Sequence, residues 1–143
     1  MKEITGDIWD YHGWGYWIVI TTNGSLNTKG EAMMGKGIAL QAKLKFPRIT
    51  KWLGINLTNK GNQLFVNHPF RIITFPTKDN WKERAKLSLI ATSCKELVEA
   101  CKGTTDEVYM IRPGCGNGQL DWKDVKPILE EYLDNRFVVV ERS

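Results

Sequence analysis

Two glycine-rich loops are the segments of this 143-residue chain whose residue types most clearly indicate chemistry. In Thr22–Ile38 and in Arg112–Trp122, a run typical of a buried strand leads into a glycine-containing turn and then into a helix. Glycine lets the backbone approach a ligand closely, and unpaired N–H groups at a helix start can satisfy phosphate oxygens. Neither loop has the spacing of a P-loop or of a Gly-x-Gly-x-x-Gly dinucleotide motif. Two such loops predict a diphosphate held between them; the alternative is that the glycines merely form turns.

Lys78 directly follows a predicted buried strand. A lysine amine can act as a nucleophile only when deprotonated, so its pKa would have to fall from ~10.4 toward ~7 to 8. The alternative interpretation is a surface lysine before a helix. Cys94 and Cys101 fall at core positions of a helical repeat, and Cys115 has no histidine near it in sequence to activate its thiol. Because the three cysteines lack Cys-x-x-Cys spacing, we expect no metal and no disulfide framework. We also expect no cofactor.

The composition is that of a globular protein, with 42% hydrophobic, 25% charged and 10% aromatic residues. The length predicts a single domain over residues 1–143. Twenty Lys plus Arg against sixteen Asp plus Glu give a net charge of +4, which mildly favours anionic ligands without demonstrating nucleic-acid binding. No apolar run approaches the ~20 residues of a membrane span, and the N-terminus lacks the apolar core of a signal peptide. We therefore expect a cytoplasmic monomer with no membrane partner.

Hydrophobic patterning predicts alternating strands and helices. Strands are expected over residues 2–8, 16–22, 63–66, 71–75, 107–111 and 137–140, and helices over 35–46, 47–53, 80–101 and from 121 onward. Glu83, three residues after Asn80, is predicted to cap the third helix, and Asp121 the last. This order predicts an α/β fold with a largely parallel sheet covered on both faces and a ligand at the carboxyl ends of its strands.

Four motifs together resemble the macro domain family, and the resemblance extends over essentially the whole chain. They are Gly6-Asp7-Ile8, the strand motif Ile18–Asn23, the helix-start motif Met34–Gln41 and the second loop Gly114–Trp122. With Phe75–Lys78 followed by Trp81, they are most similar to the branch that contains terminal ADP-ribose glycohydrolases and the antitoxins that remove ADP-ribose from DNA. The resemblance implies a three-layer α/β/α scaffold with a central mixed, largely parallel sheet and a pocket for ADP-ribose.

The resemblance also implies roles for individual residues. Asp7, with Ile8 beside it, would accept a hydrogen bond from the adenine amino group, and Asn23, which follows Thr22, would hydrogen-bond the distal ribose and assist catalysis. The diphosphate would lie between two sets of loop residues: Gly35, Lys36, Gly37 and Ile38 on one side, and Cys115, Gly116, Asn117 and Gly118 on the other. Each role has a plainer alternative: Asp7 as a turn cap, Asn23 as a turn residue before Gly24, and Lys36 as a solvated side chain.

Three positions depart from the patterns of catalytic relatives. Ile20 stands where many relatives have an asparagine, Gly118 where terminal ADP-ribose glycohydrolases have an aspartate, and Ala39 where mono-ADP-ribosyl hydrolases have one. Their acid-dependent mechanisms therefore cannot be transferred to this chain. What remains is Lys78, which matches the lysine of the Phe-Pro-Thr-Lys motif in the DNA-directed branch. The resemblance makes its amine the candidate nucleophile for the anomeric carbon of the distal ribose.

Three functions share this predicted pocket. The preferred hypothesis is a hydrolase that removes ADP-ribose from a macromolecule, with nucleic acid slightly preferred over protein. The alternatives are a phosphatase acting on ADP-ribose 1''-phosphate and a non-catalytic ADP-ribose reader. Four tryptophans could stack on bases, although packing in the core or at a rim is the favoured interpretation: Trp14, Trp17, Trp52 and Trp81.

Overall fold

A computed structural model describes all residues 1–143 and contains six strands and five helices. In chain order they are β1 (Lys2–Gly6), α1 (Ile8–Gly13), β2 (Trp17–Asn23), α2 (Gly37–Lys45), α3 (Ile49–Lys60), β3 (Phe65–Asn67), β4 (Ile72–Lys78), α4 (Leu87–Ala100), β5 (Val108–Met110), α5 (Trp122–Tyr132) and β6 (Phe137–Arg142). None of these helices combines the length and apolar character needed to cross a bilayer.

The strands form one mixed sheet in the order β1-β6-β5-β2-β4-β3. All neighbouring pairs are parallel except β3 and β4, which form an antiparallel hairpin. The prediction of a largely parallel sheet is therefore confirmed. β2 lies between β5 and β4, so the two glycine-rich loops leave adjacent strands, β2 and β5, at the same edge of the sheet.

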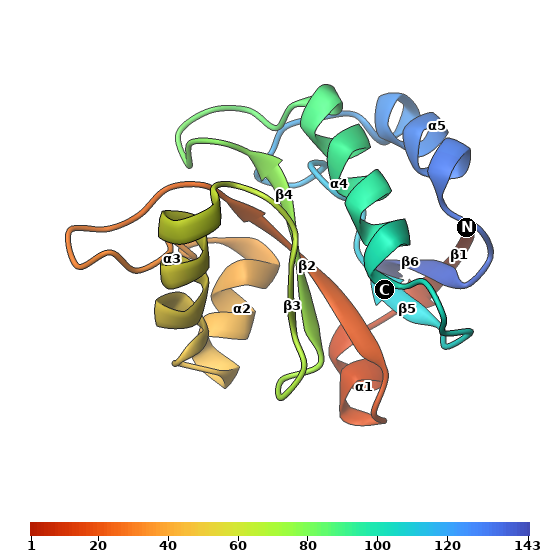
Figure 1. The fold of residues 1–143 in the computed structure, drawn as a ribbon. Helices are drawn as coiled ribbons and strands as arrows, with labels where there is room; N and C mark the ends of the chain where they lie inside the picture. Colours follow the sequence, from red (N-terminus) through yellow and green to blue (C-terminus); the bar gives the residue numbers. More distant parts are fainter.

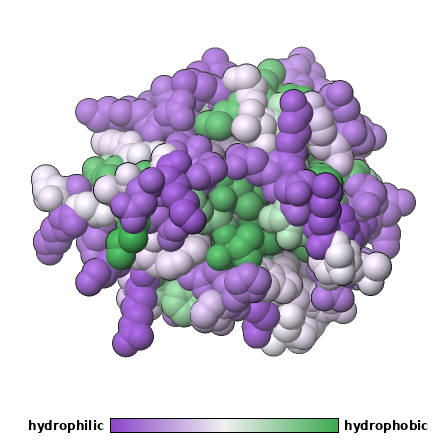
Figure 2. All heavy atoms as spheres, in the orientation of Figure 1, coloured by the Kyte–Doolittle hydropathy of each residue, from purple (hydrophilic) through white to green (hydrophobic).

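Two layers of helices cover the sheet, with α1, α2 and α3 on one face and α4 and α5 on the other (Figure 1). Strand β2 shows why, because its successive buried side chains alternate between faces. Ile18 and Ile20 pack with Ile38 and Leu53 in one core, whereas Val19 belongs to the second core. That second core includes Phe75, Ile90, Leu97, Val125 and Leu129. Most of the surface seen in Figure 2 is hydrophilic, as expected when the apolar stripes of the helices face inward.

The strand predicted over residues 2–8 ends too late. β1 stops at Gly6, and Ile8 instead begins the six-residue helix α1, which sequence patterning missed. Asp7 caps this helix because its side chain accepts the N–H of Trp9 at 2.9 Å. Ile8 and His12, four residues apart, are both buried on its inner side. One and a half turns are too short for a period of 3.6 to be distinguished from an apolar strand end.

The predicted start of the helix at Asn80 is also wrong, since α4 begins at Leu87. Glu83 does accept the backbone N–H of Asn80, at 3.0 Å, but this contact closes a turn rather than a helix. The chain then extends because Ala85 donates its N–H to Gly118 and Lys86 donates its N–H to Thr77. Tertiary hydrogen bonds thus replace the helical ones. Two smaller differences concern α3 and β3. The helix predicted over residues 47–53 extends to Lys60, and the strand predicted over residues 63–66 lies at Phe65–Asn67.

Gly54 in α3 marks the closest approach between a helix and the first glycine-rich loop. A Cβ there would collide with the carbonyl oxygen of Gly30 and lie 2.9 Å from Cα of Glu31. Alanine normally stabilises a helix interior by about 1 kcal/mol relative to glycine. Here the collision with backbone outweighs that gain, so we predict that Gly54→Ala destabilises the fold by roughly 1–3 kcal/mol, measured by urea unfolding.

Gly13→Ala is the matched control, because a Cβ at Gly13 meets no atom within 4 Å. It should leave the unfolding midpoint close to that of the wild type. Equal stability of Gly54→Ala and the wild type would show that the loop can move away from α3 at no cost.

Candidate functional site

The two glycine-rich loops meet in a cavity of about 320 Å³ at the carboxyl edge of the sheet. One wall comes from the end of β2 and the start of α2, the opposite wall from the loop after β5, and a third from the end of β4. Of the residues predicted for the site, it is lined by Thr22, Asn23, Gly35, Lys36, Gly37, Ile38, Lys78, Gly116, Asn117 and Gly118. Segments almost a hundred residues apart in sequence therefore form one site.

Backbone amides without protein partners line both sides of this cavity. At the start of α2, the N–H groups of Gly37 and Ile38 have no acceptor, and no side chain caps the helix. In the second loop, the N–H groups of Gly116, Asn117 and Gly118 likewise donate to no protein atom. Unpaired amides opposite one another, with the positive end of a helix dipole, suit the oxygens of a phosphate or diphosphate.

The two loops also touch. Gly37 has a φ of +57°, and a Cβ at this position would lie 3.1 Å from Nδ2 of Asn117. Glycine is required there both for its left-handed backbone and for this close approach. Gly116, in contrast, has open space where its side chain would be. The backbone of the second loop is therefore exposed to the cavity without a side chain in the way.

Lys78 and Asn23 are brought side by side by an irregularity in the sheet. In the parallel pairing of β2 with β4, Thr22 lies opposite Pro76, but Asn23 lies opposite Lys78 because the register shifts between Thr22 and Asn23. Pro76 has no N–H to give to the ladder, and Thr77 is the extra residue. This bulge sets the end of β4 so that both predicted catalytic residues line the cavity.

The surroundings of the Lys78 amine both fix its position and lower its pKa. Its Nζ donates to the carbonyl oxygen of Trp81 at 3.2 Å. Desolvation, and then the positive charge of Lys36 across the cavity, lower the pKa of Lys78, while Glu83 opposes the shift. This is the direction that the proposed nucleophile requires.

Asn23 is already engaged by its own loop. Its Oδ1 accepts the N–H of Ser25 at 2.9 Å, and its Nδ2 donates to the carbonyl oxygen of Met33 at 3.1 Å. The side chain thus closes the segment from Asn23 to Met33 into a fixed loop. One N–H of the amide is left for a ligand, so a contact with the distal ribose stays a prediction.

A second cavity, of about 360 Å³, continues the first. It contains the remaining predicted residues, Asp7, Ile8 and Cys115, and it shares walls with the first cavity at Ile38, Ile111, Arg112 and Gly116. Asp7 uses one carboxylate oxygen to cap α1 and has its other oxygen available. The two cavities form an elongated groove, which suits an extended ligand with a hydrogen-bonding group at one end and a reactive carbon at the other.

Arg112 lines both cavities and is a site residue that was not predicted from the sequence. Its guanidinium is 3.1 Å from Glu141 and 3.9 Å from Glu3, and it lies 5.0 Å from the ring centroid of Trp122. Its place two residues after β5, at the carboxyl edge of a parallel sheet, was the available signal. Other lining residues that were not predicted to bind or catalyse are Thr21, Met33, Met34, Ala39, Thr77, Trp81 and Gly114 in the first cavity, Gly6, Gln41, Val140, Glu141 and Arg142 in the second, and Ile111 in both.

The structure explains one departure from the patterns of catalytic relatives. A Cβ on Gly118 would lie 2.6 Å from the carbonyl oxygen of Gly114 and 2.8 Å from Cβ of Ala85. An aspartate at this position would require the backbone of the second loop to move. Cys115 does not offer an alternative nucleophile, because burial raises the pKa of its thiol. No three metal-ligating side chains of the chain are grouped closely enough to hold an ion.

The four tryptophans considered for base stacking have different surroundings. Trp17 and Trp52 pack against the two hydrophobic cores. Trp14 is 70% exposed but lines neither cavity, whereas Trp81 is 41% exposed and lines the first cavity. Only Trp81 is thus both accessible and at the site.

Comparisons with known proteins identify the fold. No family model matches the chain. The macrodomain of Mycobacterium tuberculosis DarG superposes with a TM-score of 0.80 at 27% identity and that of Thermus aquaticus DarG with 0.80 at 26%, each match covering 99% of this chain and 97% of the other. The predicted three-layer α/β/α macro domain is therefore confirmed.

Curated relatives are longer proteins. The DNA ADP-ribosyl glycohydrolase of Mycobacterium tuberculosis (strain ATCC 25618 / H37Rv) is 34% identical over 104 residues, which are 66% of this chain and 30% of the relative. The DNA ADP-ribosyl glycohydrolase of Thermus aquaticus is 31% identical over 121 residues, 77% of this chain and 33% of the relative. The chain thus spans about a third of the length of these relatives.

The charge arrangement around Lys78 gives a prediction that is independent of any ligand. Replacing Lys36 by glutamine removes a positive neighbour, so the pKa of Lys78 should rise and its amine should become reactive only at higher pH. The pH dependence of Lys78 acylation, followed by mass spectrometry, measures this shift.

Glu83→Gln is the opposite control. It keeps an oxygen to accept the N–H groups of Asp79 and Asn80 but removes the negative charge, so the pKa of Lys78 should fall further. A profile that does not move in Lys36→Gln would show that Lys36 does not influence the amine.

Proposed function

We propose that this chain, a macro domain similar to the DarG macrodomains, binds ADP-ribose and hydrolyses the bond that links it to DNA, with residues 1–143 acting as one domain. The curated relatives are named DNA ADP-ribosyl glycohydrolases, which supports both the activity and the substrate. The observation that carries the proposal is Lys78, an amine of lowered pKa in the same cavity as the two amide-lined loops.

The groove accommodates the parts of ADP-ribose in one order. The adenine belongs in the second cavity, where the free oxygen of Asp7 can accept its amino group. The diphosphate belongs between the start of α2 and the loop of Gly116 and Asn117, where amides without partners replace the water around its oxygens. The distal ribose then lies at the far end of the first cavity, near Asn23 and Lys78.

Lys78 can perform the substitution at the distal ribose. Its lone pair forms a bond to the anomeric carbon of the distal ribose while the bond from that carbon to the DNA base breaks, and the base leaves with the electron pair and takes up the proton that the bonded lysine nitrogen releases. Water then adds to the same carbon and gives a proton to the lysine nitrogen as the carbon–nitrogen bond breaks, which restores the free amine and releases ADP-ribose. No aspartate is needed to activate water in the first step, in keeping with Gly118 and Ala39.

One comparison of substrates tests the proposal against its alternatives. Purified protein is offered ADP-ribosylated DNA, ADP-ribosylated protein and ADP-ribose 1''-phosphate side by side. Release of ADP-ribose from DNA supports the proposal. Phosphate release from ADP-ribose 1''-phosphate alone would make the chain a phosphatase, and binding of ADP-ribose without any turnover would make it a reader.

Asp7 gives a prediction on binding. Asp7→Asn keeps an oxygen to cap α1 but replaces the second acceptor by a donor, so ADP-ribose binding should weaken by about 1–3 kcal/mol while stability stays near that of the wild type. Calorimetry measures the affinity. Asp7→Ala should lose the same affinity and in addition about 0.5–2 kcal/mol of stability through the missing cap. Wild-type affinity in Asp7→Asn would refute the adenine contact.

Lys78 gives a prediction on catalysis. Lys78→Ala should lose ~10²-fold or more in turnover of ADP-ribosylated DNA, a barrier increase of at least ~2.7 kcal/mol, with little change in ADP-ribose affinity. Lys78→Arg keeps the positive charge but supplies no free amine, so it should be equally inactive. Wild-type rates in both variants would show that Lys78 takes no part in the reaction.

A further inference from the structure

Trp81 is a large aromatic side chain whose exposure the core does not explain. It belongs to neither hydrophobic cluster, it is 41% exposed, and it lines the first cavity together with Lys78. A tryptophan held partly in water gives up much of the stabilisation that burial would provide. Its position at the cavity therefore indicates a ligand rather than a packing role.

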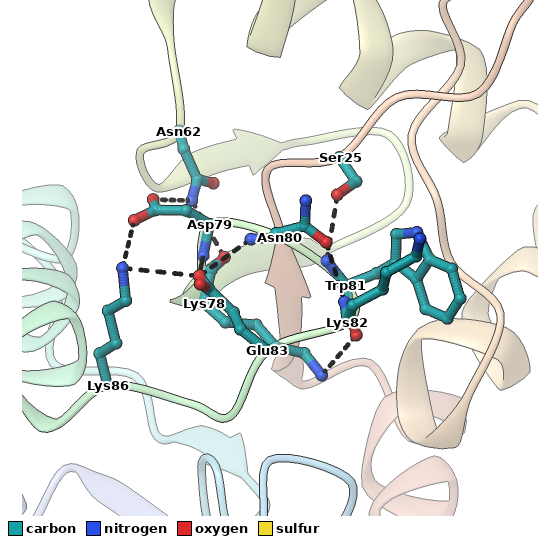
Figure 3. A network of polar contacts seen from close by, with 9 residues as sticks. All are labelled: Ser25, Asn62, Lys78, Asp79, Asn80, Trp81, Lys82, Glu83 and Lys86. Carbon is teal, nitrogen blue, oxygen red and sulfur yellow. Dashed lines mark hydrogen bonds and ion pairs between the residues drawn. The ribbon is translucent and has the colours of Figure 1, made fainter.

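The turn that carries Trp81 is fixed by polar contacts (Figure 3). Oε1 of Glu83 accepts the N–H groups of Asp79 and Asn80 at 2.8 and 3.0 Å, and the Asp79 carboxylate is 3.1 Å from Lys86. Asn62 donates to the carboxylate of Asp79 at 3.0 Å. A ring on a turn that is already ordered loses little entropy when it binds a partner.

The main chain and the side chain of Trp81 have separate roles. Its carbonyl oxygen holds Nζ of Lys78, and its N–H donates to Oγ of Ser25 at 3.0 Å. The indole makes neither of these contacts. Nζ of Lys82 lies over one face of its ring, 5.5 Å from the centroid, so a planar ligand would stack on the other face with this cation beside it. Figure 3 shows the ring projecting away from the hydrogen-bonded turn, with Lys82 beside it.

We propose that the indole of Trp81 stacks on the nucleobase to which ADP-ribose is attached, while Lys82 contacts a neighbouring phosphate of the strand. This inference rests on the proposed function, because the leaving base must lie next to Lys78 when the amine reaches the anomeric carbon. Adenine of the ADP-ribose itself is assigned to the other end of the groove, at Asp7, so it does not compete for Trp81. A base can stack on the indole only when it is free of its own duplex, so the substrate is single-stranded at this point.

The pairing of the Trp81 ring with Lys82 would also make the site favour ADP-ribosylated DNA over ADP-ribosylated protein. A nucleobase has a π-face for the indole and a phosphate nearby for Lys82. An aliphatic glutamate or aspartate side chain, as an acceptor of ADP-ribose in a protein, has neither. Trp81 is thus a specificity-determining residue, and its contribution appears only with the nucleic-acid part of the substrate.

Binding in a Lys78→Ala background tests the inference without turnover. The probes are a single-stranded oligonucleotide bearing one ADP-ribosyl group and free ADP-ribose. Adding Trp81→Ala should weaken binding of the oligonucleotide by roughly 5- to 150-fold, the range of one base–aromatic stack, and leave the affinity for ADP-ribose unchanged. Trp81→Phe should retain most of the oligonucleotide affinity. Trp14→Ala, which removes an exposed tryptophan outside both cavities, should change neither.

Two results would overturn the inference. One is an equal loss of affinity for both probes in Trp81→Ala, which would mean that the ring supports the ADP-ribose site itself. The other is an unchanged affinity for both probes. Wild-type cleavage of the same oligonucleotide is measured separately, so failure of the proposed hydrolysis is distinguished from failure of the stacking contact.

Discussion

The parallel pairing of β2 with both of its neighbours is the constraint on which the site depends. β5 on one side and β4 on the other must both run in the direction of β2 for the two glycine-rich loops and Lys78 to meet at one edge. The buried alternation Ile18-Val19-Ile20 holds this strand between two cores. A slip of one residue would exchange the faces of these side chains, so the packing of the core also fixes the register of the site.

The site contains two sources of positive potential, the partial charges of backbone N–H groups and the full charges of lysine side chains. Neutral amides of α2 and of the second loop face the place assigned to the diphosphate, so the negative charge of a diphosphate can be bound there without a lysine contact. Desolvation, and then repulsion by the positive charge of Lys36, lower the pKa of Lys78. A bound diphosphate opposes this effect through its negative charge.

Much of the fold and site could be predicted from the sequence because the signals were local. Buried strands, the Asp121 cap and glycines before helices are read from neighbouring residues, and all thirteen predicted site residues, the twelve assigned to binding together with Lys78, line the groove. What could not be predicted depends on contacts between distant segments. Arg112 was missed because its importance comes from lying where two cavities join, and the steric exclusion of a side chain at Gly118 comes from Ala85 and Gly114.

The segment from Asp79 to Lys86 shows why a wrong local prediction can mark a functional region. Its sequence has a capping pair, and the pair forms, yet the chain does not continue as a helix. Instead, Ala85 donates its N–H to Gly118, which ties the end of β4 to the second loop. A helix starting at Asn80 would require the N–H of Ala85 for the carbonyl oxygen of Trp81, which here accepts Nζ of Lys78 instead. The local preference for a helix is thus overridden at the place where tertiary contacts hold the two glycine-rich loops and the amine of Lys78 in position around the cavity.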